Sequence, residues 1–408
     1  MNKFPSSCIL LFASYGAILC LAGDPKTTPP PAQAGEPAPM EKKAADRPVR
    51  LSLPREIHAV PGVEMNVYFD NIVLAPNIRG CLFDVDCKFG RHDQDRWTYV
   101  PEDKDAGNFP LTVKVFDTNE RLLAEATTTV YVPPKDAGKD QALTLLMVGD
   151  SLTAASVYPA ELHRMLSMPE NPKVTFIGSH SGRGRPPGEG VPLHEGYGGW
   201  AWSTFCAKYD KKAPTPPGTS PFVFLKDGKP GLDFKAYCDR KNNGKAPDYI
   251  TVFLGTNDTF GAKDATIEQT IDKMFQYADT LIAEFRKVGP KTKIGIALVH
   301  PPCASQDGFG NNYKCGQTRW QYRKNQHRAV ERLLEKFAGR EKEGLFIIPL
   351  NVNLDCANNY PKEEKPVNAR NPRKIMRDCN GVHPATEGYN QIADSFYCWL
   401  KYMLSRKQ

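Results

Sequence analysis

Ser151 is the residue of this 408-residue chain whose type and surroundings point most directly to chemistry. It follows the apolar run Leu143 to Val148 and the turn residues Gly149 and Asp150. Such a run is typical of a strand buried on both faces of a parallel sheet, and Gly, Asp and Ser favour sharp turns. We therefore expect Ser151 at the carboxyl end of a central strand, where open α/β sheets bind their ligands.

A serine hydroxyl is a weak nucleophile unless a base takes its proton. Of the eight histidines, His383 is the strongest candidate for this base. It lies on a predicted loop directly before the C-terminal helix, so the last crossover can bring it over the same edge of the sheet. Two further stretches supply candidate hydrogen-bond donors, Gly199 in GYGGW (196–200) and Asn257 in VFLGTND (252–258).

In their order and contexts, the blocks GDS, GYGGW, LGTND and NGVHPATEGYNQIA resemble the SGNH (GDSL-type) hydrolase family over about residues 140–404. The resemblance implies that Ser151 is the nucleophile and His383 the base. It also implies an oxyanion hole formed by the Ser151 and Gly199 N–H groups and the Asn257 side-chain amide. Such donors stabilise the negative charge that develops on a reacting carbonyl oxygen.

Asn380 is the departure from the family pattern, because the family usually has an aspartate three residues before the histidine. An amide oxygen can accept a hydrogen bond from the imidazole ring, but it stabilises an imidazolium less than a carboxylate does. Three alternatives follow: a Ser-His dyad oriented by Asn380 or a backbone carbonyl, a displaced third member at Asp378, or a slow site. We favour the first, and interpret Asp150 and Asp258 as turn-stabilising.

Trp200 and Trp202 directly follow the oxyanion glycine. Exposed aromatic rings at this place could stack on a sugar, and this is the main indication of a carbohydrate substrate; packing within the loop is an equal alternative. No CxxC pair is present, and the sequence implies neither a metal nor an organic cofactor.

The fold predicted for residues 140–408 is α/β, a flavodoxin-like three-layer α/β/α domain with about five parallel strands. The later strands and the helices are recognised from apolar runs and from apolar residues at helical spacing. The strands are expected at 174–178, 249–254, 293–299 and 345–350, and the main helices from Pro159, over 267–288, over about 320–337 and over 389–404. The segments 179–248 and 300–318 lack periodicity and are expected to shape the binding cleft.

Residues 49–136 show short runs of alternating apolar and polar residues, which predict a small all-β, immunoglobulin-like sandwich. Trp97 or Tyr99 could give this region a carbohydrate-stacking surface, although we favour a place in its core. Residues 1–22 have the pattern of a signal peptide, and residues 23–48 that of a disordered linker rich in Pro and Ala. A lipoprotein anchor at Cys20 is the less favoured alternative.

Nine cysteines follow the predicted signal peptide, and export would permit disulfides. Local spacing suggests the pairs Cys81–Cys87, Cys206–Cys238, Cys303–Cys315 and Cys356–Cys379, with Cys398 left as a buried thiol. The formal charge of +7 is mild and no basic tract is interleaved with aromatics, so nucleic acid is not an expected partner. No later segment is apolar enough to cross a membrane.

These features predict a secreted or periplasmic serine esterase that removes O-acyl groups, most of all O-acetyl groups, from a carbohydrate. The polar, glycine-rich loops argue against the first alternative, a lipase or thioesterase for longer acyl chains. The second alternative, suggested by Asn380 and the β-region, is a non-catalytic carbohydrate-binding or surface protein.

Overall fold

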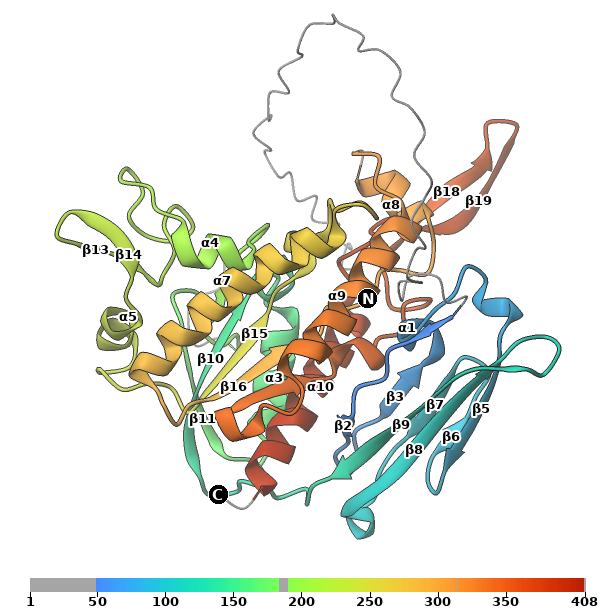
Figure 1. Ribbon diagram of the computed structural model, residues 1–408, viewed down its shortest axis with the longest axis horizontal. Coiled ribbons are helices and arrows are strands. Elements are labelled where there is room, and N and C mark those ends of the chain that lie inside the picture. Colours follow the sequence, from blue (N-terminus) through green and yellow to red (C-terminus); the bar gives the residue numbers. More distant parts are fainter. Residues whose placement is uncertain (1–48, 183–189, 314, 407–408) are drawn as a thin grey trace, which may run out of the picture. The chain divides into compact units, whose positions relative to one another are not determined.

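A computed structural model describes residues 49–182, 190–313 and 315–406 (Figure 1). The predicted signal peptide and linker lie outside these ranges. The chain from residue 49 onward belongs to one compact unit. Among the described residues, no helix combines the length and apolar character needed to span a membrane.

A parallel sheet forms the centre of the C-terminal region, from about residue 140 onward. Its strands lie in the order β11, β10, β15, β16 and β17, and every neighbouring pair is parallel. This flavodoxin-like order confirms the predicted α/β fold. A short strand, β12, extends the sheet beside the last two residues of β10. The bounds are β10 Ala142–Gly149, β11 Lys173–Ile177, β12 Glu195–Gly196, β15 Tyr249–Phe253, β16 Lys293–Ala297 and β17 Leu345–Ile348.

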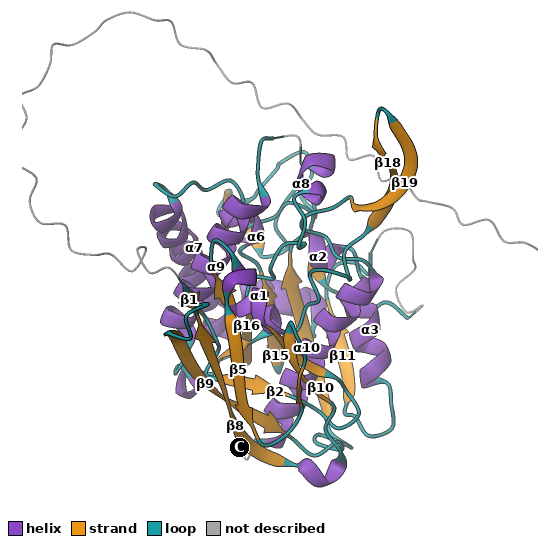
Figure 2. Ribbon diagram, turned by 90° about the vertical axis from the view of Figure 1, so that its right-hand side faces the viewer, coloured by secondary structure: helices purple, strands orange, loops and turns teal. Residues whose placement is uncertain are grey.

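Helices cover both faces of this sheet, as Figures 1 and 2 show. Side chains of β10 alternate between two cores: Leu146 and Val148 belong to one, and Leu145 and Met147 to the other. Because both faces are buried, the strand reads as a continuous apolar run. The first core contains α7 (Ile267–Val288) and α9 (Arg319–Phe337), and the second contains α3 (Val157–Leu166) and α10 (Thr386–Ser405).

The two long aperiodic segments contain short elements of their own. The first carries α4 (Trp202–Ala207), β13 (Val223–Lys226), β14 (Lys229–Leu232) and α5 (Phe234–Lys241), and the second carries α8 (Asp307–Asn312). Large aromatic side chains from α4 and α5 are buried in the first core, which anchors that segment to the sheet. A hairpin that the sequence did not predict, β18 (Lys362–Asn368) and β19 (Asn371–Asp378), precedes the loop of His383.

The N-terminal region is all-β apart from short helical turns, and its three small sheets share one hydrophobic core. Trp97 and Tyr99 are buried in that core, so neither ring offers a stacking surface. The detailed immunoglobulin-like topology stays a prediction. The elements are β1 Arg50–Leu51, β2 Glu56–His58, β3 Met65–Tyr68, α1 Phe69–Ile72, β4 Val73–Leu74, β5 Leu82–Cys87, β6 Arg91–His92, β7 Arg96–Tyr99, β8 Gly107–Phe116 and β9 Leu122–Val132.

The four predicted disulfides are wrong, because all nine described cysteines are free thiols. Cys81 and Cys87 flank one extended strand, β5. Six residues of strand span roughly 20 Å, whereas bridged Cα atoms lie only about 4.4–6.8 Å apart. The extended strand between Cys81 and Cys87 therefore holds their Cα atoms too far apart for a disulfide. Cys398 is buried in the second core, as expected.

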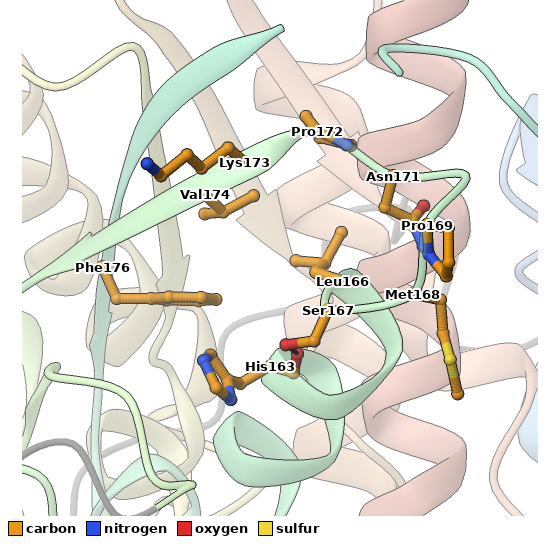
Figure 3. Close-up of a pocket in the computed structure, with 10 residues that line it drawn as sticks. All are labelled: His163, Leu166, Ser167, Met168, Pro169, Asn171, Pro172, Lys173, Val174 and Phe176. Atoms are coloured by element: carbon orange, nitrogen blue, oxygen red, sulfur yellow. Dashed lines mark hydrogen bonds between the residues drawn. The ribbon is translucent and has the colours of Figure 1, made fainter. Parts of the chain in front are cut away.

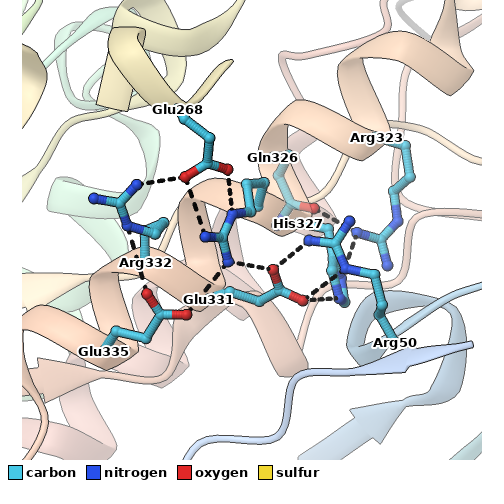
Figure 4. Close-up of polar contacts among 9 residues, drawn as sticks. Arg50, Glu268, Arg323, Gln326, His327, Glu331, Arg332 and Glu335 are labelled. Atoms are coloured by element: carbon cyan, nitrogen blue, oxygen red, sulfur yellow. Dashed lines mark hydrogen bonds and ion pairs between the residues drawn. The ribbon is translucent and has the colours of Figure 1, made fainter. Parts of the chain in front are cut away.

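Arg323 of α9 joins the β-region to the sheet domain. Its guanidinium is fully buried and donates to the backbone carbonyl oxygens of Asp70, Asn71 and Val73. Figure 4 shows the neighbouring polar contacts, including the ion pair of Arg50 with Glu331, whose Nε to Oε1 distance is 2.9 Å. Desolvation lowers the Arg323 pKa to about 10, which leaves the side chain charged at neutral pH.

We expect Arg323→Met to lower the free energy of unfolding by about 3–5 kcal/mol, because it strands three buried carbonyl oxygens without a donor. Lys324→Met is the matched control on the same helix: Lys324 pairs with the exposed carboxylate of Asp264 at the surface, so its loss should cost below about 1 kcal/mol. Urea unfolding followed by circular dichroism measures both. Equal decreases in the free energy of unfolding for the two variants would contradict the conclusion that Arg323 joins the β-region to the sheet domain.

Candidate active site

Ser151 lies where the sequence predicted, at the carboxyl end of β10. Gly149 ends that strand, and a Cβ atom on it would lie 1.9 Å from Thr153 Oγ1, so only glycine fits. Asp150 then caps the short helix α2 (Ser151–Ala154) by accepting from the Leu152 N–H at 2.9 Å. Ser151 is therefore the first residue of a helix held against the edge of the sheet.

His383 reaches Ser151 from the other end of the hydrolase region. It lies on the loop between β19 and α10, and its Nε2 atom is 2.8 Å from Ser151 Oγ. Desolvation lowers the pKa of His383 to about 4, so the ring is neutral at neutral pH. A neutral imidazole in hydrogen-bond contact with a serine hydroxyl is the arrangement that general-base activation requires.

The other ring nitrogen of His383 faces a residue that the sequence did not single out. Tyr313 Oη lies 3.2 Å from His383 Nδ1 and donates to Asn380 Oδ1 at 3.1 Å. Asn380 Oδ1 also accepts from the N–H groups of Val382 and His383. Asn380 therefore shapes the loop, and the hydroxyl of Tyr313 lies between it and the imidazole.

Asp378, the alternative third member, is placed differently. It ends β19, and its carboxylate forms an ion pair with Lys362 Nζ of β18 at 2.7 Å. This pair closes the base of the hairpin, which gives Asp378 a structural partner away from the imidazole. The contact of His383 Nδ1 is with Tyr313 Oη instead, and a displaced aspartate stays a prediction.

Gly199 and Asn257 are brought to the same edge by β12 and β15. Val148 and Gly149 pair with Glu195 and Gly196, so the loop that follows β12 begins beside Ser151. Gly199 has φ +75°, a conformation that favours glycine, and its N–H has no hydrogen-bond partner within the described ranges. That N–H is available to a ligand.

Asn257 stands on the short helix α6 (Thr256–Thr259), directly after β15. Its Nδ2 atom donates to Asp150 Oδ2 at 3.2 Å and to the Trp200 carbonyl at 2.9 Å. The side chain thus connects the turn of Ser151 with the loop of Gly199. Both amide hydrogens are engaged in this resting arrangement, so a substrate oxyanion would have to share one of them.

Two buried carboxyl groups support these turns. Asp150 has its pKa raised to about 7 by desolvation, and Asp258 has its pKa raised to about 7 for the same reason. Asp258 accepts from the Trp202 N–H at 3.3 Å. The geometry agrees with the interpretation that both residues stabilise turns.

Of the two alternatives for Trp200 and Trp202, their burial supports packing within the loop. Their exposed fractions are 4% and 1%, and both rings pack in the first core. Trp200 lies against Tyr197 and Phe205, with ring centroids 4.3 and 4.8 Å away. Burial of these large rings holds the loop of Gly199 in place and leaves them no exposed face for stacking on a sugar.

A surface cavity of about 350 Å³ lies elsewhere, between the end of α3 and the start of β11 (Figure 3). Its lining includes His163, Leu166 and Phe176 but none of the candidate catalytic residues. It opens beside the amino-terminal end of β11, whereas Ser151 follows the carboxyl end of β10. Within the described ranges, no group of three His, Cys, Asp or Glu side chains could hold a metal ion.

Tyr313 and β12 are the parts of the site that sequence reasoning missed. Tyr313 belongs to the 300–318 connection, which leaves from the carboxyl side of β16, and this position could have marked its polar side chains as candidates. Its neighbours show no periodicity from which the direction of the ring could be read. β12 is only two residues long, so it carries no strand pattern.

Several solved structures show a distant similarity to this chain. Similar solved structures include a possible lipase from Chitinophaga pinensis, with 15% identity, TM-score 0.35 and coverage of 64% of this chain and 98% of that one. Another is a carbohydrate acetylesterase family member from Sinorhizobium meliloti, with 15% identity, TM-score 0.37 and coverage of 65% and 100%. Similarity at this level assigns no substrate to this chain. No curated protein sequence matches it.

The profile of the GDSL-like Lipase/Acylhydrolase family matches residues 145–396, which is more than half of the chain and includes Ser151, Gly199, Asn257 and His383. Membership of this family supports hydrolysis of an ester bond. The chain therefore belongs to the GDSL-like lipase/acylhydrolase family.

Proposed function

We propose that this protein is a serine esterase that works through a covalent acyl-enzyme, with Ser151 as nucleophile and His383 as general base. The observation that carries the proposal is the 2.8 Å contact between Ser151 Oγ and His383 Nε2. A non-catalytic binding protein would have no need of a neutral imidazole beside a serine at the end of a central strand. The contact therefore favours the enzyme over that alternative.

In the first half of the reaction, Ser151 Oγ attacks the ester carbonyl carbon while its proton passes to His383 Nε2. The tetrahedral intermediate then collapses, and the same proton goes to the leaving alcohol oxygen. In the second half, His383 takes a proton from water, whose oxygen attacks the acyl-enzyme. Ser151 Oγ leaves as a hydroxyl with that proton, and the carboxylic acid is released.

The oxyanion of each intermediate is proposed to bind the N–H groups of Ser151 and Gly199. Ser151 begins α2, so its N–H has no acceptor within the helix. Gly199 holds its N–H on an exposed loop fixed by buried Trp200. Asn257 would add a third donor by sharing an amide hydrogen with the oxyanion.

For the substrate, we propose an O-acetylated carbohydrate outside the cell. No large apolar side chain that is exposed in the described ranges belongs to the turns of Ser151, Gly199, Asn257 or His383. A long acyl chain would need such a surface, whereas an acetyl group does not. The predicted signal peptide, which lies outside the described residues, is the basis for proposing export, where polysaccharides are accessible.

We expect a fluorophosphonate probe to label the wild-type protein at Ser151 and to leave Ser151→Ala unlabelled, because the probe reacts only with an activated serine. His383→Ala should lose labelling as well, since it removes the base. Ser156→Ala is the matched control, being a nearby serine that contacts a different histidine, His194. Peptide mass spectrometry locates the adduct, and an unlabelled wild-type protein would refute the proposed nucleophile.

Turnover of p-nitrophenyl esters tests the acyl group. Because no strongly exposed large apolar side chain belongs to the described turns around Ser151, acetate should be hydrolysed with a higher kcat/KM than octanoate. Ser151→Ala serves as the blank for uncatalysed hydrolysis. A higher kcat/KM for octanoate would reject the acetyl preference and favour a lipase or thioesterase.

The low pKa of His383 sets the expected pH dependence. Its neutral form is the base, so protonation of His383 should not lower kcat/KM for p-nitrophenyl acetate until the pH falls below about 5. The value of kcat/KM should then decline with a midpoint near the His383 pKa of about 4. Circular dichroism at each pH controls for unfolding. A midpoint near 6.5, the ordinary histidine value, would show that His383 is solvated rather than buried.

A further inference from the structure

The tautomer of His383 decides whether it can act as a base toward Ser151. Nε2 must carry a lone pair to accept the Ser151 proton, so the ring proton must sit on Nδ1. Hydrolases with a catalytic triad secure this with a carboxylate, and in one of them replacing that aspartate by asparagine slows turnover about 10⁴-fold through the wrong tautomer. Here Nδ1 instead faces the hydroxyl of Tyr313, at 3.2 Å.

The orientation of the Asn380 amide is fixed by its own loop. The atom that contacts Tyr313 Oη also lies 3.0 Å from the Val382 N–H nitrogen and 2.9 Å from the His383 N–H nitrogen. Both backbone groups can only donate, so this atom must be the amide oxygen and not the NH₂ group. It can therefore only accept from Tyr313.

A tyrosine hydroxyl has one proton to donate. Tyr313 gives that proton to Asn380 Oδ1, over 3.1 Å, so a lone pair of Oη remains for His383. An oxygen lone pair 3.2 Å from Nδ1 is satisfied when Nδ1 carries the ring proton. The chain of donors then runs from His383 Nδ1–H to Tyr313 Oη–H and on to Asn380 Oδ1.

We propose that Tyr313 is the positioning residue of this active site, and that its hydroxyl, oriented by Asn380, holds His383 in the tautomer that can accept the Ser151 proton. The role of this tautomer in turnover rests on the esterase function proposed above, whereas the tautomer itself does not. Tyr313 thus takes the place that the family gives to an aspartate, without its charge.

The surroundings of Tyr313 hold its hydroxyl at this place. Its ring packs between Phe260 and Phe309, with centroid distances of 5.3 and 5.9 Å. Phe309 belongs to a small buried cluster that also contains Tyr322 and Tyr360. These contacts involve the ring alone, so Tyr313→Phe removes the hydroxyl while keeping the packing.

A neutral hydroxyl orients the imidazole but does not offset its positive charge. Burial alone accounts for the low pKa of His383, and no carboxylate contributes to it. The Tyr313 hydroxyl therefore fixes which ring nitrogen of His383 carries the proton, without making the imidazole a stronger base. Loss of the hydroxyl should consequently change kcat through the tautomer and leave KM nearly unchanged.

Nuclear magnetic resonance of the full chain labelled with ¹⁵N-histidine tests the proposal directly. The long-range correlation pattern of an imidazole distinguishes Nδ1–H from Nε2–H, and His383→Ala assigns the signals. At pH 7 we expect His383 of the wild type to be predominantly in the Nδ1–H form. In Tyr313→Phe we expect a mixture or the Nε2–H form, with kcat for p-nitrophenyl acetate reduced about 10- to 100-fold.

Tyr360→Phe is the matched control. Tyr360 belongs to the same buried cluster and donates its hydroxyl to the Pro301 carbonyl at 2.6 Å, so its loss is purely structural. We expect this variant to keep the Nδ1–H tautomer and a kcat within about twofold of the wild type. The proposal is overturned by an Nε2–H tautomer in the wild type, or by a Tyr313→Phe protein whose His383 keeps the wild-type tautomer.

Failure of the esterase proposal gives a different result. If the wild type hydrolyses no ester and takes up no fluorophosphonate, the proposed function is wrong, but the NMR pattern of His383 still reports what Tyr313 does to the ring. If the wild type is active and Tyr313→Phe leaves the tautomer unchanged, the function stands and the role of Tyr313 is rejected.

Discussion

The close approach of Gly149 to Thr153 is the constraint on which the active site depends. A Cβ atom on Gly149 would lie 1.9 Å from the Thr153 hydroxyl oxygen, so β10 can pass into α2 only through glycine. That passage fixes Ser151 at the sheet edge, and the other groups are placed relative to it. β12 pairs with Gly149, and Asn257 bonds to Asp150, the next residue in the chain. The site is thus built outward from one backbone turn.

The polar groups around this turn are largely buried, and burial shifts their pKa values toward the uncharged forms. Burial keeps His383 unprotonated and raises the pKa of Asp150 and of Asp258 to about 7. In a buried interior, hydrogen bonds are stronger than in water because the local dielectric constant is low. Orientation by uncharged partners, Tyr313 and Asn380, suits such an interior, since a buried carboxylate would carry a large desolvation cost.

Much of the fold could be predicted from the sequence, because a strand buried on both faces must be apolar throughout and a covering helix must be apolar at every third or fourth position. The contact of Ser151 with His383 followed from motifs at the ends of such elements. Tyr313 could not be found in this way, since its position depends on packing within an aperiodic connection. The direction of Trp202 was left open for a related reason: local sequence does not say that the loop turns its aromatic rings inward. The hairpin 362–378 was missed because it lacks an apolar face.

The contacts of Arg323 with the β-region have a consequence for the order in which parts of the chain can fold. The carbonyl oxygens that it binds belong to residues some 250 positions earlier, at Asp70, Asn71 and Val73. During synthesis the β-region leaves the ribosome long before α9 has been made. The interface between the β-region and α9 therefore cannot form until most of the sheet domain has been translated. Contacts of such high sequence separation form late and slowly. The β-region surface that contacts α9 therefore stays exposed until α9 has been made. A chain that ends before α9 would leave this surface open to other partners.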